Sequence, residues 1–146
     1  KASALPAGKW TFTRMLCLKA PYSSSISPLF EELKPNSCKI SIKKKRSVLN
    51  HIGTVHAIAM CNMAELAGGT MTEVTVPATH RWIPKGMSVE YLKKADTDLI
   101  AIATPVEDHY DWDKAGEYLV NVDVLDQHND KVFHATITMW VSKKKK

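Results

Sequence analysis

Cysteine is scarce in this sequence. Its three cysteines, Cys17, Cys38 and Cys61, form an odd set with no CxxC pair, which argues against a disulfide framework and against a structural zinc site. Long apolar runs are missing too, because no stretch approaches the roughly 20 residues that span a bilayer. We therefore expect a reduced, cytoplasmic protein with no metal site and no membrane contact.

Acidic residues are scarce in the first third of the chain. Residues 1–50 hold ten lysines and arginines against two acids, residues 51–142 hold six against thirteen, and four terminal lysines follow. Clustered positive charge attracts anionic partners, so residues 43–46 (KKKR) are candidates for binding cofactor phosphates or nucleic acid. A solvated strand end is the other interpretation of this cluster, and the acid-free residues 1–30 also allow a transit peptide.

Several segments alternate apolar and polar residues with the period of two that is typical of strands. One lies before the middle of the chain and the others follow it, at residues 38–43, 87–92, 99–106, 118–124 and 132–141. Residues 10–19 favour a short helix. Pro28 and Pro35 predict an irregular stretch with at most one helical turn between them.

One long helix is predicted in the middle of the chain, from residue 54 to about residue 71 (TVHAIAMCNMAELAGGTM). Thr54 can serve as its N-cap, and Gly68 and Gly69 weaken or end its last turns. A helix that is apolar nearly all round must be buried on every side, by a curling sheet or by a partner subunit. The order of elements therefore predicts an α+β fold, with an antiparallel sheet on one helix.

The length of 146 residues is that of one domain. We expect residues 1–36 to form the N-terminal helix and an irregular lead-in, and residues 143–146 to form a disordered lysine tail. Neither a repeat nor a long linker divides the rest of the chain. The prediction is a single domain over residues 1–146.

Residues 50–57 (NHIGTVHA) and 64–69 (AELAGG) resemble the hotdog-fold acyl-CoA thioesterase superfamily, in particular its phenylacetic-acid-type branch and a small bacterial subfamily of poorly assigned function. Residues 89–95 (VEYLKKA) resemble the strand that follows the helix in these proteins, and the similarity covers roughly residues 37–142. The resemblance implies the hotdog fold, in which an antiparallel sheet wraps around one long central helix. It also implies homodimers with one continuous sheet, often paired into tetramers, and active sites between subunits that bind the pantetheine of acyl-CoA.

Thioester hydrolysis needs a base or nucleophile, and a donor for the oxyanion that develops on the carbonyl. The resemblance assigns the first role to Glu65 and the second to the backbone N–H of Ala57, with Asn50 holding the carbonyl or the water. A helix start supplies such N–H groups, because they have no partner inside the helix. Ile58 stands where the family has the last glycine of His-Gly-Gly, and it adds bulk there. A structural or solvent-facing Glu65 is the alternative.

Five further residues are candidates for substrate binding. Gly53 comes with the resemblance, and His56 could position the substrate or cap the helix. Asn62 lies one turn before the candidate acid and could hydrogen-bond to it. Arg81 and Lys93 carry charges that suit the phosphates of CoA.

These residues favour hydrolysis of an acyl-CoA or acyl-carrier thioester, with no cofactor apart from the CoA of the substrate. The alternative is a non-catalytic protein that binds acyl-CoA or another acyl ligand, since the glycine pair is lost and no Ser or Thr aligns with the water-orienting residue of the family. Nucleic-acid binding lacks a basic surface interleaved with aromatics. A dehydratase would need a histidine beside an acid, but His56 and Glu65 fall on opposite faces of one helix. We expect self-association as a dimer or tetramer and no nucleic-acid partner.

Overall fold

The computed structural model describes residues 8–145 of the chain, and residues 1–7 and 146 lie outside it. The elements follow in the order α1 (Gly8–Lys19), η2 (Pro21–Ile26), β1 (Leu29–Lys34), β2 (Ser37–Ile42), η3 (Arg46–Val48), α2 (Ala57–Thr75), β3 (His80–Tyr91), β4 (Leu99–Pro105), β5 (Gly116–Leu125) and β6 (Lys131–Lys143). The predicted α+β class is confirmed. No helix in this described part is both long enough and apolar enough to cross a membrane.

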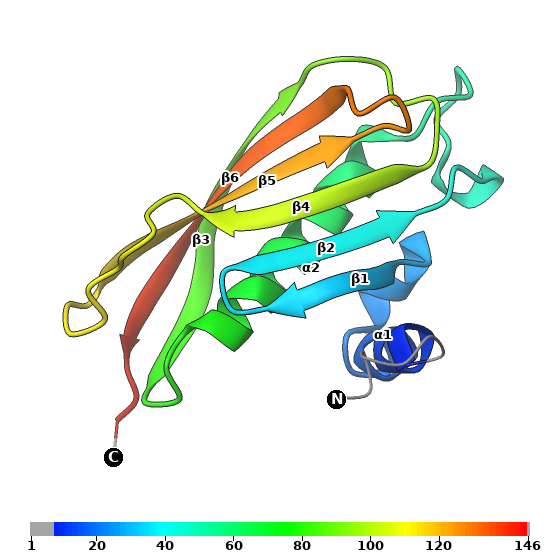
Figure 1. The fold of residues 1–146 in the computed structure, drawn as a ribbon. Coiled ribbons are helices and arrows are strands. Elements are labelled where there is room, and N and C mark those ends of the chain that lie inside the picture. Colours follow the sequence, from blue (N-terminus) through cyan, green and yellow to red (C-terminus); the bar gives the residue numbers. More distant parts are fainter. Residues whose placement is uncertain (1–7, 146) are drawn as a thin grey trace.

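The six strands form one antiparallel sheet in the order β1-β2-β4-β5-β6-β3. Helix α2 lies against one face of this curved sheet, and α1 lies beside β1 at one end (Figure 1). Strands β1 and β3 therefore form the two edges. The β3 edge is the longer one, and along its other side β3 pairs with β6 from His80 to Tyr91.

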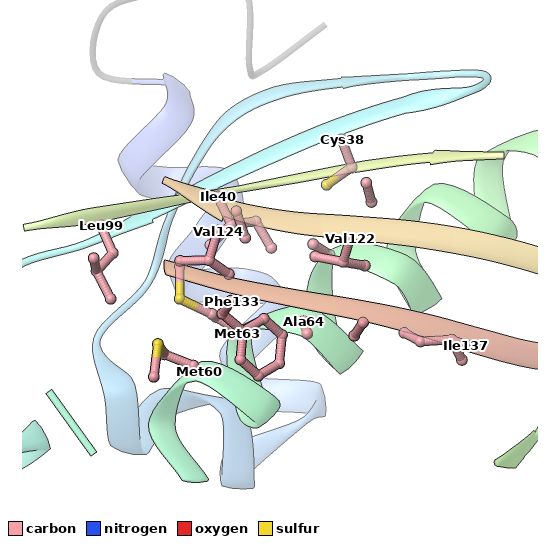
Figure 2. Packing of buried hydrophobic residues seen from close by; sticks show 14 of the residues in the cluster. Cys38, Ile40, Met60, Met63, Ala64, Leu99, Val122, Val124, Phe133 and Ile137 are labelled. Carbon is pink, nitrogen blue, oxygen red and sulfur yellow. The ribbon is translucent and has the colours of Figure 1, made fainter. Parts of the chain in front are cut away.

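The core lies between α2 and the sheet. On β5, Val120, Val122 and Val124 are fully buried and alternate with half-buried residues, as expected for a strand with one face toward the core. Met63 and Ala64 of α2 meet this face, together with side chains from β2, β4 and β6 (Figure 2). The alternation predicted at residues 38–43, 99–106, 118–124 and 132–141 thus identifies β2, β4, β5 and β6.

The prediction of an irregular stretch between Pro28 and Pro35 is wrong, because these residues form strand β1. It pairs with β2, from Leu29 opposite Ser41 to Lys34 opposite Ser37. The two prolines lie just outside the strand, at its start and in the turn after it, where a proline does not remove a hydrogen bond of the ladder. The fold therefore has two strands before α2, where the sequence pattern predicted one.

Strand β3 begins earlier than predicted, at His80, and the sequence pattern had suggested a start near Met87. Alternation of burial is lost along β3 because most of its side chains are exposed at the sheet edge. Pro84 also interrupts the pattern; it lies at an irregularity of the β3–β6 register between Pro84 and Gly86. Edge strands tolerate such a proline.

Helix α2 differs from its predicted bounds at both ends. Its N-cap is His56, two residues after the predicted Thr54, and it continues through Gly68 and Gly69 to Thr75. Close packing leaves little room for a side chain at these two positions. A Cβ on Gly68 would lie 2.7 Å from Cδ1 of Ile137, and one on Gly69 would lie 3.3 Å from Cη2 of Trp82. Both positions need a small residue because α2 approaches the sheet closely.

The C-terminal lysines do not begin a disordered tail at residue 143. Lys143 is the last residue of β6, and the backbone N–H of Lys144 donates to the carbonyl oxygen of Thr79 at 2.8 Å. This bond extends the β3–β6 pairing by one step. The predicted disorder of Lys146 concerns a residue outside the described part of the chain, and it stays a prediction.

We expect Gly68→Ala and Ile137→Val to be energetically coupled. Alanine improves helix propensity by about 1 kcal/mol, but its methyl group meets Cδ1 of Ile137, and overpacking costs about 1–3 kcal/mol. Ile137→Val removes that atom, so Gly68→Ala should be more favourable in the valine background by at least about 0.5 kcal/mol. Urea unfolding of the native protein, both single variants and the double variant measures this, and additive effects would contradict the proposed contact.

Candidate active site along the outer face of helix α2

The outer face of α2, away from the sheet, carries a stripe of residues at helical spacing. Ile58, Asn62, Glu65, Gly69 and Glu73 are separated by three or four positions and are exposed or half-buried, whereas the inner positions between them are buried. Within one chain the sheet buries only the inner face of this helix, and burial of the rest by a partner subunit stays a prediction. The outer face is open to solvent or to a partner.

A groove of about 480 Å³ lies along this stripe. Its lining includes Leu16 from α1, Tyr22 from η2, Glu65 and Leu66 from α2, and Trp82 from β3. We call this site the α2 groove. Its volume lies within the range of about 300–1,000 Å³ that is typical of small-molecule sites, and its lining is mainly apolar.

The two glutamates of the α2 groove have different surroundings. Glu73 accepts a hydrogen bond from Nε1 of Trp82 at 2.6 Å. Glu65 is exposed, and no donor within residues 8–145 lies within bonding distance of its carboxylate. The hydrogen bond predicted between Asn62 and Glu65 is not formed, because Nδ2 of Asn62 donates to Oγ of Ser25 at 3.3 Å. Of the two acids of this groove, Glu65 is therefore the one whose carboxylate is not held by another side chain of the described residues.

The start of α2 leaves one backbone N–H available. His56 is the N-cap, and its Nδ1 accepts from the N–H of Ile58 at 3.0 Å. The N–H groups of Ala59 and Met60 both reach the carbonyl oxygen of His56, at 3.0 and 3.3 Å. The N–H of Ala57 is the first of the helix and has no acceptor within it. The His56 side chain therefore acts as a cap, one of the two roles expected for it.

The loop before α2 is organised by Asn50. Its Oδ1 accepts from the N–H groups of Ile52 and Thr54 at 3.1 and 3.0 Å, and its Nδ2 donates to Oγ1 of Thr54 at 2.8 Å. Gly53 has a φ of +83°, a left-handed conformation that glycine adopts without strain. Both residues shape the turn that leads to the helix, and the Asn50 amide is already hydrogen-bonded within that turn.

Ala57 and Glu65 of one chain cannot both contact the same reacting group. Eight residues of α-helix separate them by about 12 Å along the axis. A base and an oxyanion donor must each come within about 3 Å of the reacting group. If the two act together, they must come from different chains.

The two basic candidates for CoA phosphates lie away from the α2 groove. Nζ of Lys93 binds the carboxylates of Asp130 at 2.6 Å and Asp126 at 3.4 Å, and the hydrogen bond that it donates to Asp130 is the main cause that raises the pKa of Lys93. Arg81 lies on β3, where its Nε donates to Oγ of Ser142 at 3.4 Å. Neither residue lines the groove, so the structure does not bring all the predicted site residues together.

The predicted site residues did not include Trp82 or the residues of α1 and η2 that line the α2 groove. The signal was the Gly68-Gly69 pair, which we interpreted only as a helix end. The two glycines lie against different strands of the sheet: Gly68 is close to Ile137 of β6, and Gly69 is close to the ring of Trp82 of β3. A glycine pair inside a long apolar segment indicates that bulky neighbours approach the helix on two sides.

Known structures with this arrangement of sheet and helix are hotdog proteins. A thioesterase of Haemophilus influenzae is 12% identical, with a TM-score of 0.73 over 84% of this chain and 82% of that one. A thioesterase family protein of Silicibacter pomeroyi is also 12% identical, with a TM-score of 0.75 over 90% and 96% of the two chains. The fold is therefore the hotdog fold that the sequence resemblance implied.

The chain belongs to the family described as "Domain of unknown function (DUF4442)", whose model matches residues 8–141. A crystal structure from a genomics project is 48% identical, with a TM-score of 0.86, and covers 98% of this chain and 93% of that one. None of the curated proteins compared with the sequence matches it.

We expect His56→Ala to destabilise the protein, because the first turn of α2 loses its side-chain cap. The loss should be about 0.5–2 kcal/mol, whereas His56→Asn should retain most of the stability, since asparagine is a favoured N-cap. Urea unfolding monitored by circular dichroism measures both variants. Equal losses for alanine and asparagine would show that the Nδ1 bond to Ile58 does not stabilise the helix.

Proposed function

We propose that the protein hydrolyses an acyl thioester, carried by CoA or by an acyl carrier protein, at the α2 groove. In this proposal Glu65 is the general base or the nucleophile, and the backbone N–H of Ala57 stabilises the oxyanion. The observation that carries it is that, within residues 8–145, helix α2 presents both a carboxylate with no hydrogen-bond donor, in an apolar groove, and an N–H with no acceptor, at its start. The low-identity likeness to thioesterases of the same fold supports this reaction class.

With Glu65 as a base, the reaction takes two steps. The Glu65 carboxylate takes a proton from water while the water oxygen attacks the thioester carbon, and the carbonyl oxygen becomes an oxyanion that accepts from the Ala57 N–H. The oxyanion then re-forms the carbonyl, the carbon–sulfur bond breaks, and the proton returns from Glu65 to the thiolate. The products are a free acid and a free thiol.

The proposed site needs two chains, because one chain holds its base and its donor about 12 Å apart. The long edge strand β3 offers a surface for a second copy: Ile83 is 62% exposed, Tyr91 is 60% exposed, and Met87 is also exposed. Unpaired strand edges and exposed apolar side chains both favour association. Edge-to-edge pairing through β3 would bring a second α2 groove alongside the first, as the hotdog resemblance implies.

We expect Glu65→Gln to lower kcat by about 10²–10⁴-fold, since it removes a base without changing the shape of the side chain. Release of free thiol from short, medium, long and aromatic acyl-CoAs measures this. Glu73→Gln is the matched control: it lies in the same groove and its oxygen can still accept from Trp82, so activity should stay within a few-fold of native. Activity that is equal in native protein and Glu65→Gln would remove Glu65 from the mechanism.

We expect Ala57→Pro to lower kcat by about 10²–10³-fold, because proline removes the N–H but is well tolerated at the first position of a helix. Dimers re-formed from equal amounts of Ala57→Pro and Glu65→Gln should regain about a quarter of native activity, since half the dimers are mixed and each has one intact site. Mixtures that stay as inactive as the two variants would contradict a site shared between chains.

A protein that binds acyl-CoA without hydrolysing it is the second candidate. Its support is Ile58, whose side chain is 55% exposed beside the Ala57 N–H, where bulk restricts the approach of a thioester carbonyl. Tight binding of acyl-CoA by native protein, with no thiol release on any substrate, would favour this candidate. Ile58→Gly would then be expected to raise turnover from that background.

A further inference from the structure

A second cavity, on the other side of α1 from the α2 groove, has no part in the function proposed above. Its volume is about 480 Å³, and its lining residues come from α1, η2, β1 and the neighbouring ends of β2 and β4. The two sites have no lining residue in common: Leu16 of α1 faces the α2 groove, whereas Trp10, Arg14 and Cys17 face this second site. We call it the α1 cavity.

The interior of the α1 cavity is apolar. Ile42 and Leu99, each 2% exposed, form part of its floor and lie opposite each other where β2 pairs with β4. Leu29 and Trp10 complete this surface from β1 and α1. Cys17 also lines it, but burial raises the pKa of its thiol, so it is a packing residue there and not a nucleophile.

Three cations surround this apolar floor: Arg14, Lys43 and Lys45. Within residues 8–145, no carboxylate lies at ion-pair distance from any of them, although the guanidinium of Arg14 does lie 5.6 Å from the centre of the Trp10 ring. Lys44, between the two lysines, instead binds Asp96 at 2.6 Å. Lys44 is not among the residues that line the cavity, whereas Lys43 and Lys45 on either side of it are.

Asp98 is the acidic residue that lines the α1 cavity within the described part of the chain, and its single negative charge leaves the lining net positive. Its Oδ1 accepts a hydrogen bond from the backbone N–H of Lys44 at 2.7 Å. Ser27 and Ser41 add hydroxyl groups to the wall. The cavity thus combines an apolar floor, unpaired positive charge and hydroxyl donors, which together suit an anion with an apolar body.

We propose that the α1 cavity binds a small amphipathic anion, a phosphate monoester or carboxylate with an aliphatic or aromatic body, whose head lies between Arg14, Lys43 and Lys45. Two of the four basic residues at positions 43–46, Lys43 and Lys45, then bind a specific ligand. Burial of the apolar body supplies affinity, and the three cations select the charged head. The site is independent of the thioester chemistry proposed for Glu65.

Isothermal titration of the full chain with octyl phosphate, octanoate and octanol tests this proposal. We expect octyl phosphate to bind at one molecule per chain, octanoate to bind more weakly, and octanol to bind weakest. The double variant Lys43→Gln/Lys45→Gln should weaken octyl phosphate binding about tenfold or more. Ser41→Phe, which fills the cavity without changing charge, should weaken all three ligands.

Two controls make the result specific to the α1 cavity. Lys94→Gln/Lys114→Gln removes the same number of charges from other exposed positions and should leave binding unchanged. Glu65→Gln should also leave it unchanged, and a change in affinity in either direction in that variant would place the ligand in the α2 groove and overturn the proposal. Equal weakening by the two lysine double variants would overturn it as well, because the effect would then be general surface charge.

A further experiment distinguishes binding of a free ligand from binding to a lipid surface. Phosphatidic acid in vesicles presents the same phosphate monoester on an apolar body, so the protein is sedimented with vesicles of phosphatidylcholine containing phosphatidic acid. We expect no co-sedimentation, since the apolar floor lies inside a cavity. Binding to these vesicles without binding to octyl phosphate would overturn the proposal in favour of membrane association.

Discussion

The close contact between the inner face of α2 and the centre of the sheet is the constraint on which the other features depend. Small residues on that face, Ala64, Ala67 and Gly68, are fully buried or nearly so and let the helix approach β5 and β6. The interior is close-packed, so this contact fixes how the helix is rotated about its axis. Once that rotation is set, the positions of the outer residues follow.

The outer face of α2 carries the polar residues because the inner face has no room for them. Glu65 and Glu73 both line the α2 groove there, together with Leu16 of α1. Helix α1 also separates two sites of similar volume but different character. The α2 groove holds acids beside an apolar wall, whereas the α1 cavity holds unpaired cations around an apolar floor.

The start of α2 is set by local hydrogen bonds in the preceding loop. The Asn50 side chain closes the turn, and the His56 ring satisfies the N–H of Ile58. The N–H of Ala57 is left at the end of the helix dipole, where developing negative charge is stabilised. Its distance from Glu65 along the helix makes any joint action of the two groups a property of an assembly and not of one chain.

The sequence by itself determined the class of fold and the main elements. The alternation over residues 118–124 and 132–141, and the apolar segment around Met63, are local signals that depend only on which side chains follow one another. Tertiary structure decided the rest. Strand β1 forms between two prolines because β2 pairs with it, His56 replaces Thr54 as the cap, and Asn62 bonds Ser25 in place of Glu65. Likewise, Arg14 lines the same cavity as Lys43 and Lys45 only after folding. Residues far apart in the chain come together through tertiary packing, which no local sequence pattern specifies.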